Sequence, residues 1–378
     1  MTRSKVYFTN MRTTFTTSLL RKLSILMDKA GINSIDFNHK FAAIKMHFGE
    51  PGNLAFLRPN YAKVVADKVK ELGGLPFLTD CNTLYVGGRK NALDHLDSAM
   101  LNGFSPLSTG CQIIIGDGLK GTDDVEVPVN GGELCKTARI GRAIMDADII
   151  ISLSHFKGHE LAGFGGAIKN IGMGCGSRAG KKDQHSDGKP HVRQKACVGC
   201  GSCARICAHG APTKNADGKM TIDKDKCTGC GRCIGICPFD AIVPDFDGSV
   251  EMLNKKMAEY TKAVIDGRPH FHIAVITDVS PYCDCHPEND APIVPNLGIA
   301  VSFDPVALDR ACADIVNAAP VLANSVLADN IQSSPNECKG HDHFHNTTAI
   351  TNWQGCLDHA EKIGIGTQNY ELITLDIK

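Results

Sequence analysis

Eight cysteines stand in two groups of identical spacing, thirty residues apart. Each group reads Cys-x2-Cys-x2-Cys-x3-Cys, and their members are Cys197, Cys200, Cys203, Cys207 and Cys227, Cys230, Cys233, Cys237. In this spacing three cysteines of a tight loop bind one 4Fe-4S cluster, and the fourth cysteine points toward a second cluster. The duplication therefore predicts two 4Fe-4S clusters with crossed ligand sets. The predicted sets are Cys197, Cys200, Cys203 with Cys237, and Cys227, Cys230, Cys233 with Cys207.

Zinc is the alternative metal for such a pattern. It also binds paired Cys-x2-Cys knuckles, but it takes four tetrahedral ligands, whereas this segment offers eight in a crossed arrangement. The chain contains 17 cysteines in all. In a reducing cytoplasm these are better explained as thiolate ligands and core residues than as disulfides.

A second candidate site lies upstream of the cysteine motifs, in ISLSHFKGHELAGFGGAIKN and the residues that follow it. Its glycines would let backbone approach a ligand closely, and its lysines would attract an anion. The predicted cofactor-binding glycines are Gly163, Gly165 and Gly166, and the lysines are Lys157, Lys169, Lys181 and Lys182. The candidate catalytic residues are His155, His159, Lys169 and His185. The alternative is a tight strand-to-helix connection with solvated lysines.

Two further groups contain possible metal ligands. Cys283, Asp284, Cys285 and His286 follow an apolar run, and they fit either a third metal site or buried thiols in a turn. Near the C-terminus, Cys338, His341, His343 and His345 could bind a divalent ion from one strand face or form a mobile loop. The remaining lone cysteines, such as Cys81, are expected to be small core residues.

Short apolar runs with turn or helical sequence between them predict the scaffold. The runs 41–48, 75–80, 111–118, 147–156, 271–280 and 297–305 have the composition of buried strands. Residues 60–74, 89–104 and 249–266 have apolar residues at helical spacing. The alternation predicts an α/β fold, a mostly parallel sheet with helices on both faces. Polar residues at strand ends would meet at one sheet edge.

The composition changes abruptly around the cysteine motifs. Residues 190–247 are therefore predicted to form a small α+β ferredoxin-like insert that carries the clusters. Residues 1–189 and 248–378 would together make one discontinuous α/β domain.

The charge balance restricts the partners. With 40 basic and 41 acidic residues the net charge is −1, and no polybasic run suggests nucleic acid. The sequence contains neither a signal-peptide pattern nor an apolar stretch long enough to span a bilayer. We expect a cytoplasmic protein whose partner is a redox protein or a small-molecule substrate.

Several segments together resemble a prokaryotic family of uncharacterised iron-sulfur centre proteins, a domain of unknown function with a ferredoxin insert. They are IKMHFGEPGN, TDCNTLYVGGR, SHFKGH, GFGGAIKNIGMG, the two cysteine motifs, CDCH and SFDPVALD. The resemblance spans nearly the whole chain, and it implies an anaerobe-associated cytosolic redox protein.

A shorter pattern is similar to that of the nickel-pincer lactate racemases. It runs from His159 through the glycine-rich segment to Lys169, with His185 downstream. The resemblance implies proton transfer by His159, covalent cofactor attachment at Lys169 and metal ligation by His185. The racemases lack the cysteine-rich insert.

Three functions remain open from the sequence. An oxidoreductase would pass electrons between the clusters and a ligand at the glycine-rich loop. An electron carrier would use the α/β domain only to dock in a larger anaerobic complex. A racemase-like enzyme would keep the clusters as structural parts and use a base such as His159. Neither a P-loop nor a strand-linked G-x-G-x-x-G motif is present to suggest a nucleotide.

Overall fold

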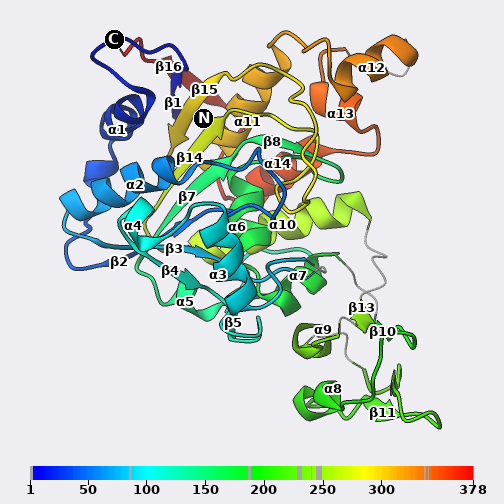
Figure 1. Ribbon diagram of the computed structural model, residues 1–378. Helices are drawn as coiled ribbons and strands as arrows, with labels where there is room; N and C mark the ends of the chain where they lie inside the picture. Colours follow the sequence, from blue (N-terminus) through cyan, green and yellow to red (C-terminus); the bar gives the residue numbers. More distant parts are fainter. Residues whose placement is uncertain are drawn as a thin grey trace.

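An eight-stranded sheet forms the centre of the computed structural model, which describes residues 3–84, 87–185, 189–227, 232–239, 241–243, 249–335, 338 and 340–377 (Figure 1). The strand order is β16-β1-β15-β14-β7-β2-β3-β4. The bounds are β1 Ser4–Asn10, β2 Phe41–Lys45, β3 Leu75–Asp80, β4 Gln112–Ile115, β7 Ile149–His155, β14 His270–Ile276, β15 Gly298–Ser302 and β16 Tyr370–Thr374. Within this sheet β15 alone runs opposite to the others, so the predicted mostly parallel sheet is confirmed.

Helices cover both faces of the sheet, as predicted. The strand β7 shows why, because every one of its residues is buried and successive side chains enter opposite cores. Ile149 and Ile151 pack on one face with α1 (Leu19–Ala30) and α2 (Pro59–Glu71). Ile150 packs on the other face, where α6 (Ala167–Cys175) and α10 (Val250–Ile265) lie. The helices α11 (Pro305–Asn317) and α14 (Trp353–Lys362) extend that second layer.

The sequence identifies the central elements better than the edge. All six apolar runs form strands, and the three helical patterns correspond to α2, α3 (Ala92–Leu101) and α10. The edge strand β16 and its neighbour β1 were not predicted. Their residues are largely exposed or half-buried, so no continuous apolar run marks them.

The remaining elements of the main body are short. They are η1 Ile32–Ser34, α4 Pro106–Thr109, β5 Asp124–Pro128, β6 Thr137–Gly141, α5 Arg142–Met145, β8 Lys157–His159, β9 Gly163–Gly165, α7 Arg178–His185, α12 Val326–Ser333 and α13 His343–Thr347. Two of the histidines near the C-terminus, His343 and His345, therefore belong to a helix, whereas the sequence suggested a strand face or a mobile loop. The Asp342 carboxylate accepts from the backbone N–H of His345 at 3.1 Å and caps that helix.

The cysteine-rich segment forms a small body that protrudes from the main domain, at the lower right of Figure 1. Its elements are β10 His191–Val192, α8 Ser202–Ile206, β11 Pro212–Lys214, β12 Met220–Ile222, α9 Arg232–Ile236 and β13 Ile242–Val243. The strands pair as β10 with β13 and β11 with β12, both antiparallel.

Candidate functional site

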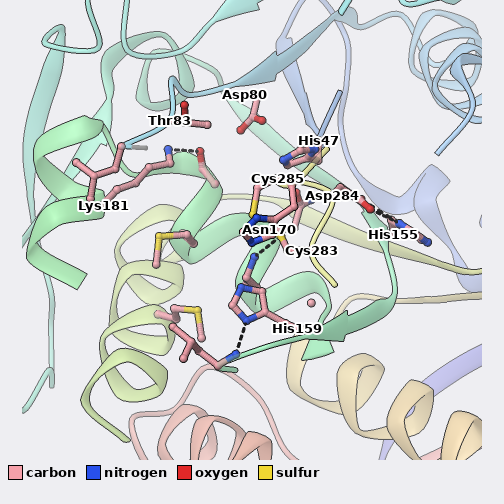
Figure 2. Close-up of a pocket in the computed structure, with 18 of the residues that line it drawn as sticks. His47, Asp80, Thr83, His155, His159, Asn170, Lys181, Cys283, Asp284 and Cys285 are labelled. Atoms are coloured by element: carbon pink, nitrogen blue, oxygen red, sulfur yellow. Dashed lines mark hydrogen bonds and ion pairs between the residues drawn. The ribbon is translucent and has the colours of Figure 1, made fainter. Parts of the chain in front are cut away.

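A cavity of about 530 Å³ opens at the carboxyl ends of the central strands (Figure 2). His47 follows β2, Asp80 ends β3, His155 ends β7, and Cys283 and Cys285 lie on the loop after β14. The helices α6, α7 and α10 complete the wall. Ligand sites are common at this edge of parallel sheets, so the topology itself makes the cavity a candidate active site.

The Cys283 thiol is the chemical centre of this cavity. It is only 1% exposed, and the ammonium groups of Lys169 and Lys157 lie 3.3 and 3.7 Å from its sulfur. A hydrogen bond from Cys285 lowers the pKa of Cys283 most, and the two lysines and His159 lower it further, against the opposing effect of burial. The arrangement therefore favours a thiolate, which is the reactive form of cysteine.

Replacement of Lys169 by methionine tests this assignment. Loss of a positive charge 3.3 Å from the sulfur should raise the pKa of Cys283. The measurement is the pH titration of thiolate absorbance in the wild type and in Lys169→Met, each corrected with a Cys283→Ser background. The exposed Lys120 gives the matched control Lys120→Met. An unchanged titration in Lys169→Met would contradict the thiolate assignment.

The hairpin β8–β9 fixes the protonation of His159. Its Nδ1 accepts hydrogen bonds from the backbone N–H groups of Leu161 and Ala162 at 3.1 and 3.0 Å. The proton of the neutral ring must therefore be on Nε2, which is the nitrogen that donates to Cys283. Burial, followed by the charge of Lys169, lowers the pKa of His159 and keeps the ring neutral. The geometry suits a hydrogen-bond donor better than a general base.

His155 lies in the same region but faces a different partner. Its Nδ1 lies 2.9 and 3.0 Å from the two carboxylate oxygens of Asp284, and Nε2 donates to the carbonyl oxygen of Thr277 at 2.7 Å. Burial would raise the pKa of Asp284, but the charges of His155 and Lys157 outweigh it and lower that pKa. Both ring nitrogens are thus occupied. This predicted catalytic histidine holds the loop that carries Cys283 and Cys285.

His185 belongs to the group around Lys169 and His159. It ends α7 and lines the cavity together with Lys181. Burial, then the charges of His159, Lys169 and Lys181, lower the pKa of His185 to about 3. The structure thus brings His159, Lys169 and His185 to one cavity. His155 lines the same cavity and contacts Asp284.

The predicted cofactor-binding glycines pack mainly against the protein itself. A Cβ atom at Gly163, where φ is +87°, would lie 2.8 Å from Trp353. A Cβ atom at Gly166 would lie 2.3 Å from the Asp309 carboxylate, which accepts from the N–H groups at the start of α6. Gly165 faces the cavity, where a Cβ atom would lie 2.7 Å from the Lys157 ammonium. The Asp309 side chain therefore takes the N–H groups at the start of α6, and an anionic ligand at the glycine run stays a prediction.

A buried layer of ion pairs supports the cavity, and sequence reasoning missed it. The Lys45 ammonium lies 3.0 Å from both the Asp80 carboxylate and the Asn170 amide oxygen. Arg89 donates to the Glu50 carboxylate at 2.7 Å. A lysine at the end of the apolar run FAAIK was the available signal, since a buried strand rarely contains an unpaired charge.

His95 provides a pH test of this layer. Its Nε2 lies 3.8 Å from Asp80, and burial lowers its pKa to about 3, against the opposing charge of Asp80. On acidification the unfolded chain takes up this proton first, near pH 6.5, so the folded state loses stability below that pH. Between pH 7 and 5.5, the free energy of unfolding of the wild type should therefore fall by about 1 kcal/mol more than that of His95→Gln. Urea unfolding at both pH values measures this difference, and a pH-independent difference would contradict it.

Glu160, Cys285 and His286 form a cluster at the mouth of the cavity. Their ligand atoms lie within 4.8 Å of one another, close enough in principle to share an ion. The His286 ring nitrogen Nε2 and the Glu160 carboxylate are 2.8 Å apart and hydrogen-bonded to each other. No such group includes the C-terminal histidines within the described ranges. His343 and His345 instead have backbone carbonyl oxygens as partners.

The described cysteines of the small body share one core, except for the exposed Cys200. Cys197, Cys203, Cys233 and Cys237 are buried there together with Met220 and Ile242, whereas Cys230 lies outside the described residues. Burial raises the pKa of Cys203, and the nearby Cys237 and Cys200 thiols raise it further. Backbone N–H groups of Met220 and Ala241 donate to the sulfurs of Cys197 and Cys237, both at 3.3 Å. Cys203 therefore has a cysteine of its own group and the last cysteine of the other group as neighbours.

The small body adjoins the cavity at two places. Leu84 is buried in the core of the cysteines and also lines the cavity. The helix α7, which carries Lys181 and His185, packs against α9, which carries Cys233. The two candidate sites are thus separated by a few packed side chains.

Residues 42–314 match the model of a protein family described as a domain of unknown function, DUF362. The chain belongs to the DUF362 family. This confirms the domain of unknown function that the sequence motifs suggested, and it leaves the activity open.

Two solved structures share similarity with this DUF362 protein. A structural-genomics crystal structure from Thermotoga maritima has a TM-score of 0.37 and 13% identity, and it covers 78% of this chain. This chain spans 57% of that protein's length. The lactate racemase apoprotein from Thermoanaerobacterium thermosaccharolyticum has a TM-score of 0.40 and 11% identity, over 98% of this chain and 83% of the racemase. No curated protein matches the chain. Among the described residues no helix is long and apolar enough to cross a membrane.

Proposed function

We propose that this protein is an iron-sulfur oxidoreductase that binds two 4Fe-4S clusters in its small body and reacts with a ligand in the adjoining cavity. The observation that carries the proposal is the internal symmetry of the small body. The helix α9 begins and ends thirty residues after α8. The strand pairs follow the same relation: Val192 pairs with Ile242, and the residues thirty positions away from each, Ile222 and Pro212, pair with each other. Each two-stranded sheet therefore combines one strand from each repeat.

Crossed strand pairing supports crossed cluster ligands. Because the repeats exchange strands, the last cysteine of one repeat is brought beside the first three of the other. The proximity of Cys203 to both Cys200 and Cys237 fits this arrangement. The small body would hold its clusters through the eight cysteines of the two motifs.

The cysteine loop also has the tight backbone that such a site requires. Gly199 and Gly201 have φ values of +71° and +75°, a region that favours glycine. A Cβ atom at Gly199 would lie 2.2 Å from the carbonyl oxygen of Gly218. N–H groups aimed at the sulfurs of Cys197 and Cys237 fit thiolates bound to a charged centre.

The position of the small body supports electron exchange with the cavity. Bound 4Fe-4S clusters supply one-electron oxidation and reduction. Leu84 and α7 form the short protein layer between the cysteines and the cavity. At the cavity the buried lysines hold Cys283 as a thiolate, and His159 directs its Nε2 proton toward that sulfur.

These features favour an oxidoreductase over the two other functions. A docking body for an electron carrier would not need a cavity of about 530 Å³ with a buried thiolate. A racemase-like reaction needs a base, and the two backbone donors at His159 Nδ1 leave the proton on Nε2. The cavity suits a small substrate that exchanges electrons.

Iron and acid-labile sulfide analysis of anaerobically purified protein tests the proposal. We expect about eight of each per chain, as two 4Fe-4S clusters require. Zinc in place of iron, or iron well below this content after anaerobic reconstitution, would overturn the proposal.

A further inference from the structure

The loop after β14 presents two cysteines to the cavity and holds them in place. Cys283 and Cys285 point toward the cavity centre in Figure 2, while Asp284 between them faces His155. The Asp284 carbonyl oxygen accepts from the N–H of Glu50 at 2.9 Å, and the N–H of His286 donates to the Cys283 carbonyl at 3.0 Å. A hydrogen bond from the Cys285 thiol to the Cys283 sulfur lowers the pKa of Cys283 and raises the pKa of Cys285. The backbone thus brings the sulfurs together without help from a ligand.

We propose that Cys283 and Cys285 form a dithiol–disulfide centre that exchanges two electrons with the iron-sulfur clusters. The inference rests on the proposed function for its one-electron partners. In the oxidising direction the Cys283 thiolate and the Cys285 thiol form one S–S bond and release two electrons and one proton. In the reducing direction two one-electron donors and one proton restore the thiolate and the thiol.

The surroundings assign different parts to the two sulfurs. Lys157, Lys169 and His159 all lie at Cys283 and stabilise its negative charge. Burial would lower the pKa of Lys157, but Cys283 and Asp284 outweigh it and raise that pKa, so the ammonium stays charged. Cys285 donates its proton toward Cys283, and this bond with burial raises the pKa of Cys285. The reduced centre is therefore a thiolate beside a protonated thiol, the form in which a disulfide is made or broken.

A route for the proton lies beside Cys285. Glu160 and His286 are within 4.8 Å of its sulfur and share a hydrogen bond of 2.8 Å. The His286 side chain is 42% exposed, whereas Cys285 is half-buried and Cys283 is buried. A proton that leaves Cys285 on oxidation can thus pass to Glu160 and His286 and then to water.

The same contacts argue against a metal as the resident of this loop. The ammonium groups of Lys169 and Lys157 already lie 3.3 and 3.7 Å from the Cys283 sulfur. A divalent cation would have to bind beside two positive charges. The cluster fits an exchange of electrons and protons better than a cation site.

The test counts the electrons that the whole protein accepts. Air-oxidised, cluster-loaded protein is titrated with dithionite, with cluster absorbance as a second signal. We expect about four electrons per chain for the wild type, two for the clusters and two for the disulfide, and about two for Cys283→Ser. Cys312→Ala replaces a buried cysteine outside the cavity and should keep four.

A second readout separates the disulfide from other effects. Oxidised protein, unfolded and alkylated, should leave Cys283 and Cys285 unlabelled in a peptide lighter by two hydrogens than the reduced form. About two electrons in the wild type with full cluster bleaching would overturn the inference and leave the proposed function standing. Two electrons without any cluster signal, all lost in Cys283→Ser, would support the dithiol–disulfide centre but overturn the proposed function and with it the electron exchange with clusters. A stoichiometric metal that is lost in Cys283→Ser would also overturn the inference.

Discussion

Replacement of Cys203 by alanine is expected to lower the iron content of the anaerobic protein from about eight to about four per chain. Cys203 lies in the core of the small body beside Cys200 and Cys237, so its loss removes one ligand of one set only. The other set has no member among these three residues. Iron analysis after gel filtration measures the change.

The crossed arrangement makes this experiment sharper. Cys237→Ala should remove the same cluster as Cys203→Ala and leave the same residual spectrum, although the two cysteines belong to different motifs. Cys207→Ala should remove the other cluster. The matched control is Cys111→Ala, which truncates a cysteine of similar burial in the main domain and should keep all the iron. A Cys207→Ala spectrum like that of Cys203→Ala, with a different spectrum for Cys237→Ala, would mean that each motif binds its own cluster.

The second large effect concerns stability. Replacing Lys45 by methionine should lower the free energy of unfolding by about 3–5 kcal/mol, because it leaves the Asp80 carboxylate buried without its closest partner. The side chains of Lys45 and Asp80 are only 1% and 3% exposed, and their charged atoms are 3.0 Å apart. Urea unfolding monitored by far-ultraviolet circular dichroism gives the difference.

Two controls identify the cause. Lys63→Met removes one partner of the exposed Lys63–Asp67 pair, whose side chains are 49% and 52% exposed, and it should cost less than about 1 kcal/mol. Asp80→Asn in the Lys45→Met background removes the unpaired charge and should recover part of the loss. A double variant no more stable than Lys45→Met would show that lost packing, and not the buried charge, is responsible.

The sequence predicted the central sheet because its strands are buried on both faces. Runs such as 147–156 are apolar almost without interruption, and parallel strands covered by helices require that composition. The edge strand β16 and its neighbour β1 were not predicted, because their burial is partial and they pair with segments far along the chain. The sequence pattern within one segment does not indicate which distant segment it will pair with.

The sequence predicted individual residues of the candidate site, but it did not predict the contacts between them. His159, Lys169 and His185 stood out from their types and spacing, and one cavity contains all three. The contact between Lys169 and Cys283 joins residues 114 positions apart, and only the order of the strands brings them together. The side chain that accepts from the N–H groups after the glycine run is Asp309, from yet another segment.

Electron paramagnetic resonance of the dithionite-reduced protein, with spins counted per chain, tests the central claim most directly. Two 4Fe-4S clusters held by crossed cysteines in one small body should give about two spins and a broadened spectrum from their mutual interaction. A narrow signal of about one spin, or none in protein that contains zinc, would contradict the account.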